Sequence, residues 1–552
     1  MNLRAGIFLF ILSGWILQLD VASQLSHGGR PLPLMNQLKS EIPVIDVSQL
    51  PSRLNIHEEQ PAFVNKKALI FAENHNVYIT PEKDGTWVNH SSGYRIWILG
   101  IHSPGAASLG MIFSHYRLNK GTRVFVFNKN QSAIIGSLTS ENNKYNGVLP
   151  VAHIPGDYII IQLEVPENQV DYGNLEVGTI AHGYDYGDQA NRLKDQYFGK
   201  SGDCNIDINC PAGDDFQVIK RSVCRIIISS SKRCTGNLIN NTNQDGKPYV
   251  LTAAHCIGSQ TEATSAIFLF NYESPVCNGP DVPAEDMISG STLLATGDTL
   301  GDKANIDSLD FSLVELSVSP PDSFNVYFAG WNRDSDPSAY TATIHHPRGD
   351  VKKIAFDNDP PESSYHKEDY YPEYVLYSHW RILRWDSATT EFGSSGGALL
   401  DPQHRIIGLL TGGEAYCDNP VNDYFTRFDY SWDYYNDPLR SLKPWLDPAG
   451  TGVAALDGVE ISTGLPAVDR QELMVWPNPG NGLYTIHIPQ DAMEGIYLSI
   501  FDLTGKIVFK KYYESTNRIF IDITAQPSGV YILHGLGSGQ LFTRKIIHQR
   551  YP

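Results

Sequence analysis

Tyr249-Val250-Leu251-Thr252-Ala253-Ala254-His255-Cys256 is an apolar, β-type stretch that ends in a histidine and a cysteine. A second stretch, Ser308–Leu316, carries Asp310 directly before an alternating apolar run. A third, Phe392-Gly393-Ser394-Ser395-Gly396-Gly397-Ala398-Leu399-Leu400, places serines in a glycine-rich turn before a strand. Short strands that begin or end in a polar residue indicate a β domain that presents these side chains at one place.

A serine hydroxyl becomes a nucleophile when a base lies within hydrogen-bond reach and a third group fixes the tautomer of that base. We therefore expect Ser395 to be the nucleophile, His255 the general base and Asp310 the orienting carboxylate. The glycines would let the N–H groups of Gly393 and Ser395 face a developing oxyanion, where one donor contributes about 3–4 kcal/mol. Taken singly, these residues also fit a structural histidine, a capping aspartate and a flexible loop. Their order within one exported domain favours catalysis.

The composition excludes several classes of protein. The 552 residues contain 42 Lys and Arg against 61 Asp and Glu, a formal charge of −19 that disfavours a nucleic-acid partner. With 47 Gly, 33 Pro, 29 Tyr and only 6 Met, the chain favours turn-rich β structure and is not all-α. A chain of this length is expected to form several domains.

The first residues are typical of a secretory signal peptide. Arg4 precedes an apolar stretch, and Val21-Ala22-Ser23 offers small residues for cleavage before Gln24. The alternative is a membrane anchor, but the apolar run is shorter than the roughly 20 residues that span a bilayer. No later segment is long and apolar enough to cross, so we expect a mature chain without a transmembrane anchor.

All seven cysteines lie between Cys204 and Cys417, which predicts a disulfide-stabilised central domain in an oxidising compartment. Because seven is odd, at least one thiol is unpaired within the chain. Cys224 lies in a mostly apolar run and is typical of a buried strand cysteine.

We expect an all-β chain of five parts. They are a signal peptide (1–23), a β-sandwich pro-domain (24–200), a central domain (201–458), a linker (459–473) and a C-terminal Ig-like β-sandwich (474–552). Short apolar runs separated by Gly and Pro turns support both sandwiches. Nothing in the first sandwich suggests chemistry, which suits a segment that assists or restrains its neighbour.

The central domain resembles chymotrypsin-fold serine proteases, and most closely the bacterial lysyl endopeptidases. Further matching segments are Cys204–Asp207, Cys234–Asn241, Ala329–Trp331, Ile344–Pro347 and Trp445–Pro448. The resemblance covers roughly 200–458 and implies a double β-barrel with the triad named above. It also implies the disulfides Cys204–Cys417, Cys210–Cys277 and Cys234–Cys256, with Cys224 left over.

Specificity for lysine requires a carboxylate at the base of the substrate pocket, because burying an unpaired ammonium is costly. Trypsin has its aspartate at the position of Thr389 here. The resemblance to lysyl endopeptidases instead implies Asp423, with Asp418 as the alternative. The substrate-binding strand would be Thr411-Gly412-Gly413, where Thr411 replaces a histidine of the family. The Tyr-rich acidic segment Asp357–Tyr377 also departs from the family, so tolerance of Arg or a broader cleft stays open.

Ser394 stands where trypsin-like zymogens keep an aspartate, so that no acid at this position can receive a freed amino terminus. We expect activation by removal of the N-terminal domain, and an enzyme that cuts after lysine could cleave after Lys200 itself. The pair His345-His346 could suggest a metal site, but adjacent strand residues point to opposite faces. We expect neither a metal nor a cofactor.

The C-terminal unit resembles type IX secretion sorting domains in three segments, Trp476–Tyr484, Phe501–Val508 and Pro527–Tyr531. This resemblance implies export across both membranes of a Gram-negative bacterium, the type IX machinery as a partner, and a secreted or surface location. The alternative is a carbohydrate-binding or spacer sandwich.

The sequence therefore predicts a secreted serine endopeptidase that acts on proteins or peptides, after Lys or also Arg. The alternative from another class is a catalytically inactive homologue that serves as a surface adhesin or binding module. A carbohydrate-active enzyme lacks an identifiable carboxylate pair.

Overall fold

The computed structural model forms two compact units, residues 1–463 and 464–552. It describes residues 26–34, 41–47, 68–184, 201–279, 286–297, 308–365, 374–461, 474–476, 478, 480–487, 496–502, 506–514, 518–537 and 540–549. The predicted signal peptide, Lys200 and most of the predicted linker lie outside these residues. No helix among the described residues is long and apolar enough to cross a membrane.

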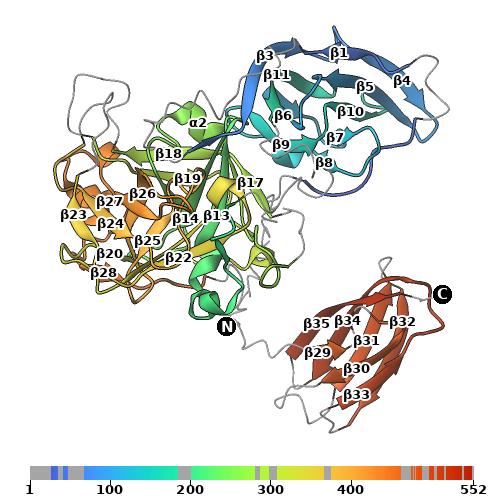
Figure 1. The fold of residues 1–552 in the computed structure, drawn as a ribbon. Coiled ribbons are helices and arrows are strands. Elements are labelled where there is room, and N and C mark those ends of the chain that lie inside the picture. The colour runs from blue at the N-terminus through green and yellow to red at the C-terminus, as the bar shows by residue number, and fades with distance from the viewer. Residues whose placement is uncertain are drawn as a thin grey trace, which may run out of the picture. The chain divides into compact units, whose positions relative to one another are not determined.

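The N-terminal part of the first unit is a sandwich of two β-sheets, as predicted (Figure 1). The six-stranded sheet contains β1 (Val44–Asp46), β4 (Thr86–His90), β5 (Tyr94–His102), β7 (Arg123–Asn128), β8 (Ile134–Leu138) and β10 (Tyr158–Pro166). The four-stranded sheet has the order β3 (Ala72–Ile79), β11 (Gly173–Gly183), β6 (Ser108–Leu118) and β9 (Leu149–Pro155).

Strand β5 of the six-stranded sheet is buried on both faces, which explains its continuous apolar sequence. Trp97 and Leu99 pack into the core between the two sheets. Ile96 and Ile98 point the other way, into a second cluster that includes Leu34 from the segment 26–34. A strand covered on both sides loses the alternation of a half-exposed strand.

The central part contains two antiparallel sheets in the chymotrypsin-like double-barrel arrangement expected from the sequence. The first has the order β17 (Met287–Ser289), β16 (Ile267–Leu269), β13 (Val223–Ile228), β14 (Lys232–Leu238), β15 (Tyr249–Thr252), β19 (Ser312–Leu316) and β18 (Ser291–Thr296). The second has the order β12 (Ile206–Asp207), β22 (Lys353–Asp357), β21 (Thr341–His345), β25 (Ala398–Leu400), β26 (Ile406–Gly413), β27 (Val421–Arg427), β24 (His379–Arg384) and β23 (Glu362–Ser364). Two short strands, β20 (Trp331–Asn332) and β28 (Ala455–Leu456), pair beside β26.

Helices in the described residues are short and lie between strands or after the last barrel strands. The α-helices are α2 (Gln260–Thr264), α3 (Phe428–Asp433) and α4 (Lys443–Leu446). The 3₁₀ segments are η1 (Ser140–Asn142), η3 (Pro211–Phe216), η4 (Ile219–Ser222), η5 (Asp322–Phe324), η6 (Pro347–Gly349) and η7 (Pro438–Arg440).

The second unit is a sandwich of its own, drawn in red in Figure 1. Its three-stranded sheet has the order β29 (Met474–Trp476), β30 (Leu483–His487) and β33 (Arg518–Asp522). Its four-stranded sheet has the order β32 (Ile507–Tyr513), β31 (Ile496–Asp502), β34 (Gly529–Gly537) and β35 (Gln540–His548). Alternate residues of β31, such as Ile496, Leu498 and Ile500, fill the core between the sheets.

The N-terminal sandwich and the first barrel share one hydrophobic core. The cluster that fills the sandwich also contains apolar side chains of the central domain: Ile227, Ile267, Leu269, Tyr272 and Met287 from the first barrel, and Val351, which precedes β22 of the second sheet. Polar contacts surround it. His153 Nε2 lies 2.7 Å from the carbonyl oxygen of Ser230, and Lys144 Nζ donates to the hydroxyl of Ser289 at 2.6 Å. The sandwich therefore packs tightly against the barrel, and the two parts form one compact unit.

Acid is expected to loosen this interface through His153. Burial, followed by the nearby Arg233 and Arg225 cations, lowers the pKa of His153 from 6.5 to about 3, while its bond to Ser230 opposes the shift. Below pH 6.5 the undocked imidazole takes up a proton that the docked one refuses, so stability falls as pH drops towards 3. Because the side chain is only partly buried, we expect a loss of about 2–4 kcal/mol.

Thermal unfolding between pH 7 and 4, measured on the Ser395→Ala protein to prevent self-digestion, tests this expectation. The same series on a protein that also carries His153→Gln separates the histidine from the carboxylates that titrate in the same range. Equal pH slopes in the two proteins would contradict the assignment.

Candidate active site

The structure brings His255, Asp310 and Ser395 together from three separate strands. His255 follows the end of β15, Asp310 precedes β19, and Ser395 lies in the turn before β25. His255 Nδ1 is 2.8 Å from Asp310 Oδ2, and its Nε2 is 2.8 Å from Ser395 Oγ. The backbone N–H of His255 donates to Asp310 Oδ1 at 2.9 Å. Asp310 thus holds the histidine at two points, and the serine can donate its proton to the opposite ring nitrogen.

The turn that carries Ser395 depends on two glycines in left-handed backbone conformations. Gly393 has φ +94° and Gly396 has φ +79°, a region that residues with a Cβ rarely adopt. Within the described part of the chain, the N–H groups of Gly393 and Ser395 have no hydrogen-bond acceptor. Unused N–H donors beside a nucleophile can donate hydrogen bonds to an oxyanion, which is the role that the sequence predicts for this pair.

Three disulfides join Cys204 to Cys417, Cys210 to Cys277 and Cys234 to Cys256, the pairs that the resemblance implies. Cys224 is a buried free thiol, and burial raises its pKa to about 12. A thiol with so high a pKa holds almost no thiolate at neutral pH, so it is chemically inert.

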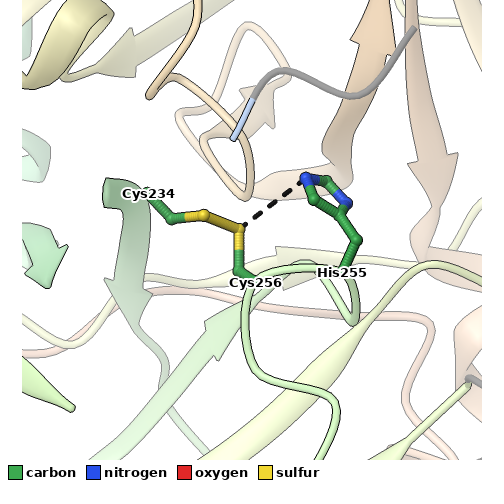
Figure 2. Close-up of side chains that lie close together, drawn as sticks. All are labelled: Cys234, His255 and Cys256. Carbon is green, nitrogen blue, oxygen red and sulfur yellow. Dashed lines mark hydrogen bonds between the residues drawn. A yellow bond between two sulfur atoms is a disulfide. The ribbon is translucent and has the colours of Figure 1, made fainter. Parts of the chain in front are cut away.

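The Cys234–Cys256 disulfide lies against the histidine (Figure 2). Cys256 Sγ is 3.8 Å from His255 Nε2. In the described residues, Cys234, His255 and Cys256 form the one group with metal-ligand spacing. Both sulfurs are consumed by the disulfide and offer no thiolate, so the group acts as a brace for His255.

Lys232, which the sequence motifs did not single out, stabilises the loop that carries His255. Its Nζ donates to the carbonyl oxygen of His255 at 2.8 Å and to Glu262 Oε1 at 2.9 Å. A lysine at the start of β14 has no motif of its own. Only the spatial contact identifies it.

The carboxylate of Asp423 lies buried beside the strand that the sequence assigns to substrate binding. Asp423 pairs with Gly413 across β27 and β26. Its Oδ2 accepts hydrogen bonds from Trp385 Nε1 at 2.7 Å and from the hydroxyl of Thr390. Because a Cβ at Gly413 would lie 2.5 Å from Asp423 Oδ1, glycine keeps the approach to the carboxylate open. Neither Trp385 nor Thr390 carried a sequence signal.

Other residues considered from the sequence lie in different settings. Asp418 is exposed, so its carboxylate stays in water. Thr389 is fully buried. Thr411 is buried with its hydroxyl 2.8 Å from Thr426 Oγ1 and 3.3 Å from His379 Nε2. Gly412 follows it on β26 and pairs with Tyr424.

Ser394 turns its hydroxyl away from Ser395, towards His345 Nδ1 at 2.7 Å. His346 bonds instead through Nδ1 to the carbonyl oxygen of Asp350 at 2.9 Å. Burial, reinforced by the Lys352 cation, lowers the pKa of His346 well below 6.5, so the ring is neutral. The two adjacent histidines therefore form hydrogen bonds with different partners, His345 with Ser394 and His346 with Asp350.

Comparisons with known proteins give matches in two parts of the chain. Residues 198–427 match the family model described as "Lysyl endopeptidase, C-terminal domain". Residues 474–549 match the model described as "Secretion system C-terminal sorting domain".

A curated lysyl endopeptidase of Pseudomonas aeruginosa is 31% identical over 300 residues, which cover 50% of this chain and 60% of that protein. The chain thus spans less than two thirds of that relative. A solved Glu endopeptidase structure, in complex with MPD, aligns over 38% of this chain and 85% of its own, with 17% identity and a TM-score of 0.25. The sequence and family-model matches confirm the two resemblances expected from the sequence, to lysyl endopeptidases in the centre of the chain and to secretion sorting domains at its end.

Proposed function

We propose that the central domain is a serine endopeptidase that hydrolyses proteins or peptides after lysine. The observation that carries this proposal is the continuous hydrogen-bonded chain from Ser395 through His255 to Asp310. In the reaction, Ser395 Oγ attacks the substrate carbonyl while His255 accepts its proton. The N–H groups of Gly393 and Ser395 then hold the oxyanion, and water hydrolyses the acyl-enzyme.

The preference for lysine rests on Asp423. The Asp423 carboxylate is buried, and its Oδ2 accepts hydrogen bonds from the Trp385 and Thr390 side chains. A buried carboxylate beside the substrate strand offers charge compensation to an ammonium group. Gly412 and Gly413 would form the strand beside the substrate, with Thr411 beneath it. The relative's printed name, lysyl endopeptidase, supports the same preference.

We further propose the domain order expected from the sequence: signal 1–23, pro-domain 24–200, protease 201–458, linker 459–473 and sorting domain 474–552. The sorting-domain match supports export by the type IX machinery to the surface or the medium of a Gram-negative bacterium. Cleavage after Lys200 would free the amine of Ser201. The Ser201 N–H already lies 3.2 Å from Asp350 Oδ2, so this buried acid could receive the new charge.

Labelling with a fluorophosphonate tests the proposal. The reagent forms a covalent bond only with an activated serine. We expect one adduct per chain, and peptide mapping should place it on Ser395 and not on the adjacent Ser394. Labelling must disappear in Ser395→Ala. A folded wild-type protein that takes up no label would support the binding-module alternative instead.

A further inference from the structure

A two-residue strand from the N-terminal part of the chain joins the first barrel next to the candidate active site. Strand β2 (Leu69–Ile70) pairs antiparallel with β14, with Leu69 opposite Arg233 and Ile70 opposite Lys232. The N–H of Phe71 continues the ladder and donates to the carbonyl oxygen of Ser231 at 2.9 Å. The barrel edge is thereby occupied as a bound peptide would occupy it.

Strand β14 leads from this pairing directly to the nucleophile. Cys234, the residue after Arg233, forms the disulfide beside His255. The next residue, Thr235, donates its N–H to the carbonyl oxygen of Ser395 at 2.8 Å. Each strand residue advances the chain by about 3.3 Å. Three residues of β14 thus connect the β2 pairing to the reacting serine.

The chain direction of β2 fits the leaving-group side of a substrate. Because the pairing is antiparallel, reading backwards from Ile70 to Ala68 follows β14 from Lys232 towards Cys234. Ala68 packs against the cluster that contains Cys234 and Cys256. In this direction β2 leads towards Cys234 and Thr235, the part of β14 that adjoins His255 and Ser395.

In the sequence, the residue before Ala68 is Lys67. We propose that residues Ala68–Ile70 occupy the leaving-group side of the protease's own active site, and that the enzyme cleaves its own Lys67–Ala68 bond. This inference rests on the proposed function, because it uses the lysine preference and the triad. It differs from the expected cut after Lys200, which would separate the pro-domain.

The cleavage uses no reagent beyond water. Ser395 Oγ bonds to the carbonyl carbon of Lys67, and the C–N bond to Ala68 breaks. His255 passes the serine's proton to the Ala68 nitrogen, which leaves as an amine. Water then cleaves the ester, giving the Lys67 carboxylate and restoring the serine.

The N-terminal sandwich would keep the cut strand in place. It holds the turn before β14 by Asn74 Nδ2 donating to Ser229 O at 2.7 Å and by His153 bonding Ser230 O. The Arg233 guanidinium lies 3.8 Å from the centre of the Phe71 ring, a further contact to the residue after β2. After cleavage at Lys67, β2 therefore stays bound beside the active site. It leaves only when the whole sandwich dissociates from the barrel.

The experiment uses the full secreted chain with Lys200→Gln, so that the sandwich stays attached. Intact mass and amino-terminal sequencing after incubation should reveal a new terminus at Ala68. Adding Lys67→Gln should abolish this product, whereas the matched neighbour Lys66→Gln should retain it. The rate should stay constant over a 100-fold range of protein concentration, since the strand is already docked. Ser395→Ala should block it.

Two results would overturn the inference while leaving the proposed function intact. One is an unsubstituted, processed enzyme that hydrolyses a lysyl peptide although no Ala68 terminus forms in the Lys200→Gln chain. The other is a cut at Lys67 whose rate rises in proportion to protein concentration. If no form hydrolyses a lysyl peptide or reacts with fluorophosphonate, the proposed function fails first and this inference falls with it.

Discussion

Asp310→Asn is expected to lower kcat/KM for a lysyl peptide by about 10⁴-fold, equivalent to roughly 5.5 kcal/mol of transition-state stabilisation. Asp310 accepts from both the backbone N–H and Nδ1 of His255, at 2.9 and 2.8 Å. An amide has one oxygen, and when that oxygen accepts from the backbone its NH₂ group faces Nδ1. The imidazole must then carry its proton on Nε2, where it can no longer accept the proton of Ser395.

Steady-state kinetics of purified, processed enzyme measure this effect. Glu315→Gln on the same strand, β19, is the matched control and should leave kcat/KM unchanged, because Glu315 pairs with Tyr249 away from the triad. Both substitutions keep the side-chain shape, so melting temperatures report any change of fold. A loss below 10-fold in a folded Asp310→Asn enzyme would show that this carboxylate does not orient the base.

Asp423→Asn should remove the preference for lysine, lowering kcat/KM for lysyl peptides by about 10²–10⁴-fold. The ammonium group of the substrate would then be buried against a neutral amide, while Trp385 and Thr390 still surround the site. Peptides with an uncharged methionine at the same position should be cleaved as fast as before or faster. The effect is a reversal of selectivity and not a general loss of activity.

Asp418→Asn is the matched control, because Asp418 is the exposed acid of the same segment. Its lysine preference should equal that of the wild type. A peptide library cleaved by the three proteins provides the measurement and also shows whether arginine is accepted. If Asp418→Asn lost the preference and Asp423→Asn kept it, the pocket would have been assigned to the wrong carboxylate.

The residues of the proposed triad could be selected from the sequence because each part has a local signature. A histidine at the end of an apolar strand, an aspartate before another and a serine between glycines can be recognised separately, although 140 residues separate His255 from Ser395. Trp385 and Thr390 could not be found in this way. A hydrogen bond to a buried carboxylate depends on tertiary packing, and many residues of these types make none.

The fold was predictable for the same reason, since runs such as those of β5, β7 and β10 are long enough to show their pattern. Strand β2 (Leu69–Ile70) could not be predicted, because two residues are too few to show a periodic pattern. Its pairing with β14 is fixed by the sandwich that follows it. The contact between the N-terminal strand and the active-site edge is therefore visible only in three dimensions.

The core shared by sandwich and barrel has a consequence for the released enzyme. If the sandwich dissociates, six apolar side chains that now pack against it become exposed to solvent: Ile227, Ile267, Leu269, Tyr272, Met287 and Val351. An exposed apolar surface of this kind tends to bind other apolar surfaces. If the proposed cleavage releases the sandwich, the remaining protein should therefore self-associate or bind lipid more readily than the full chain does.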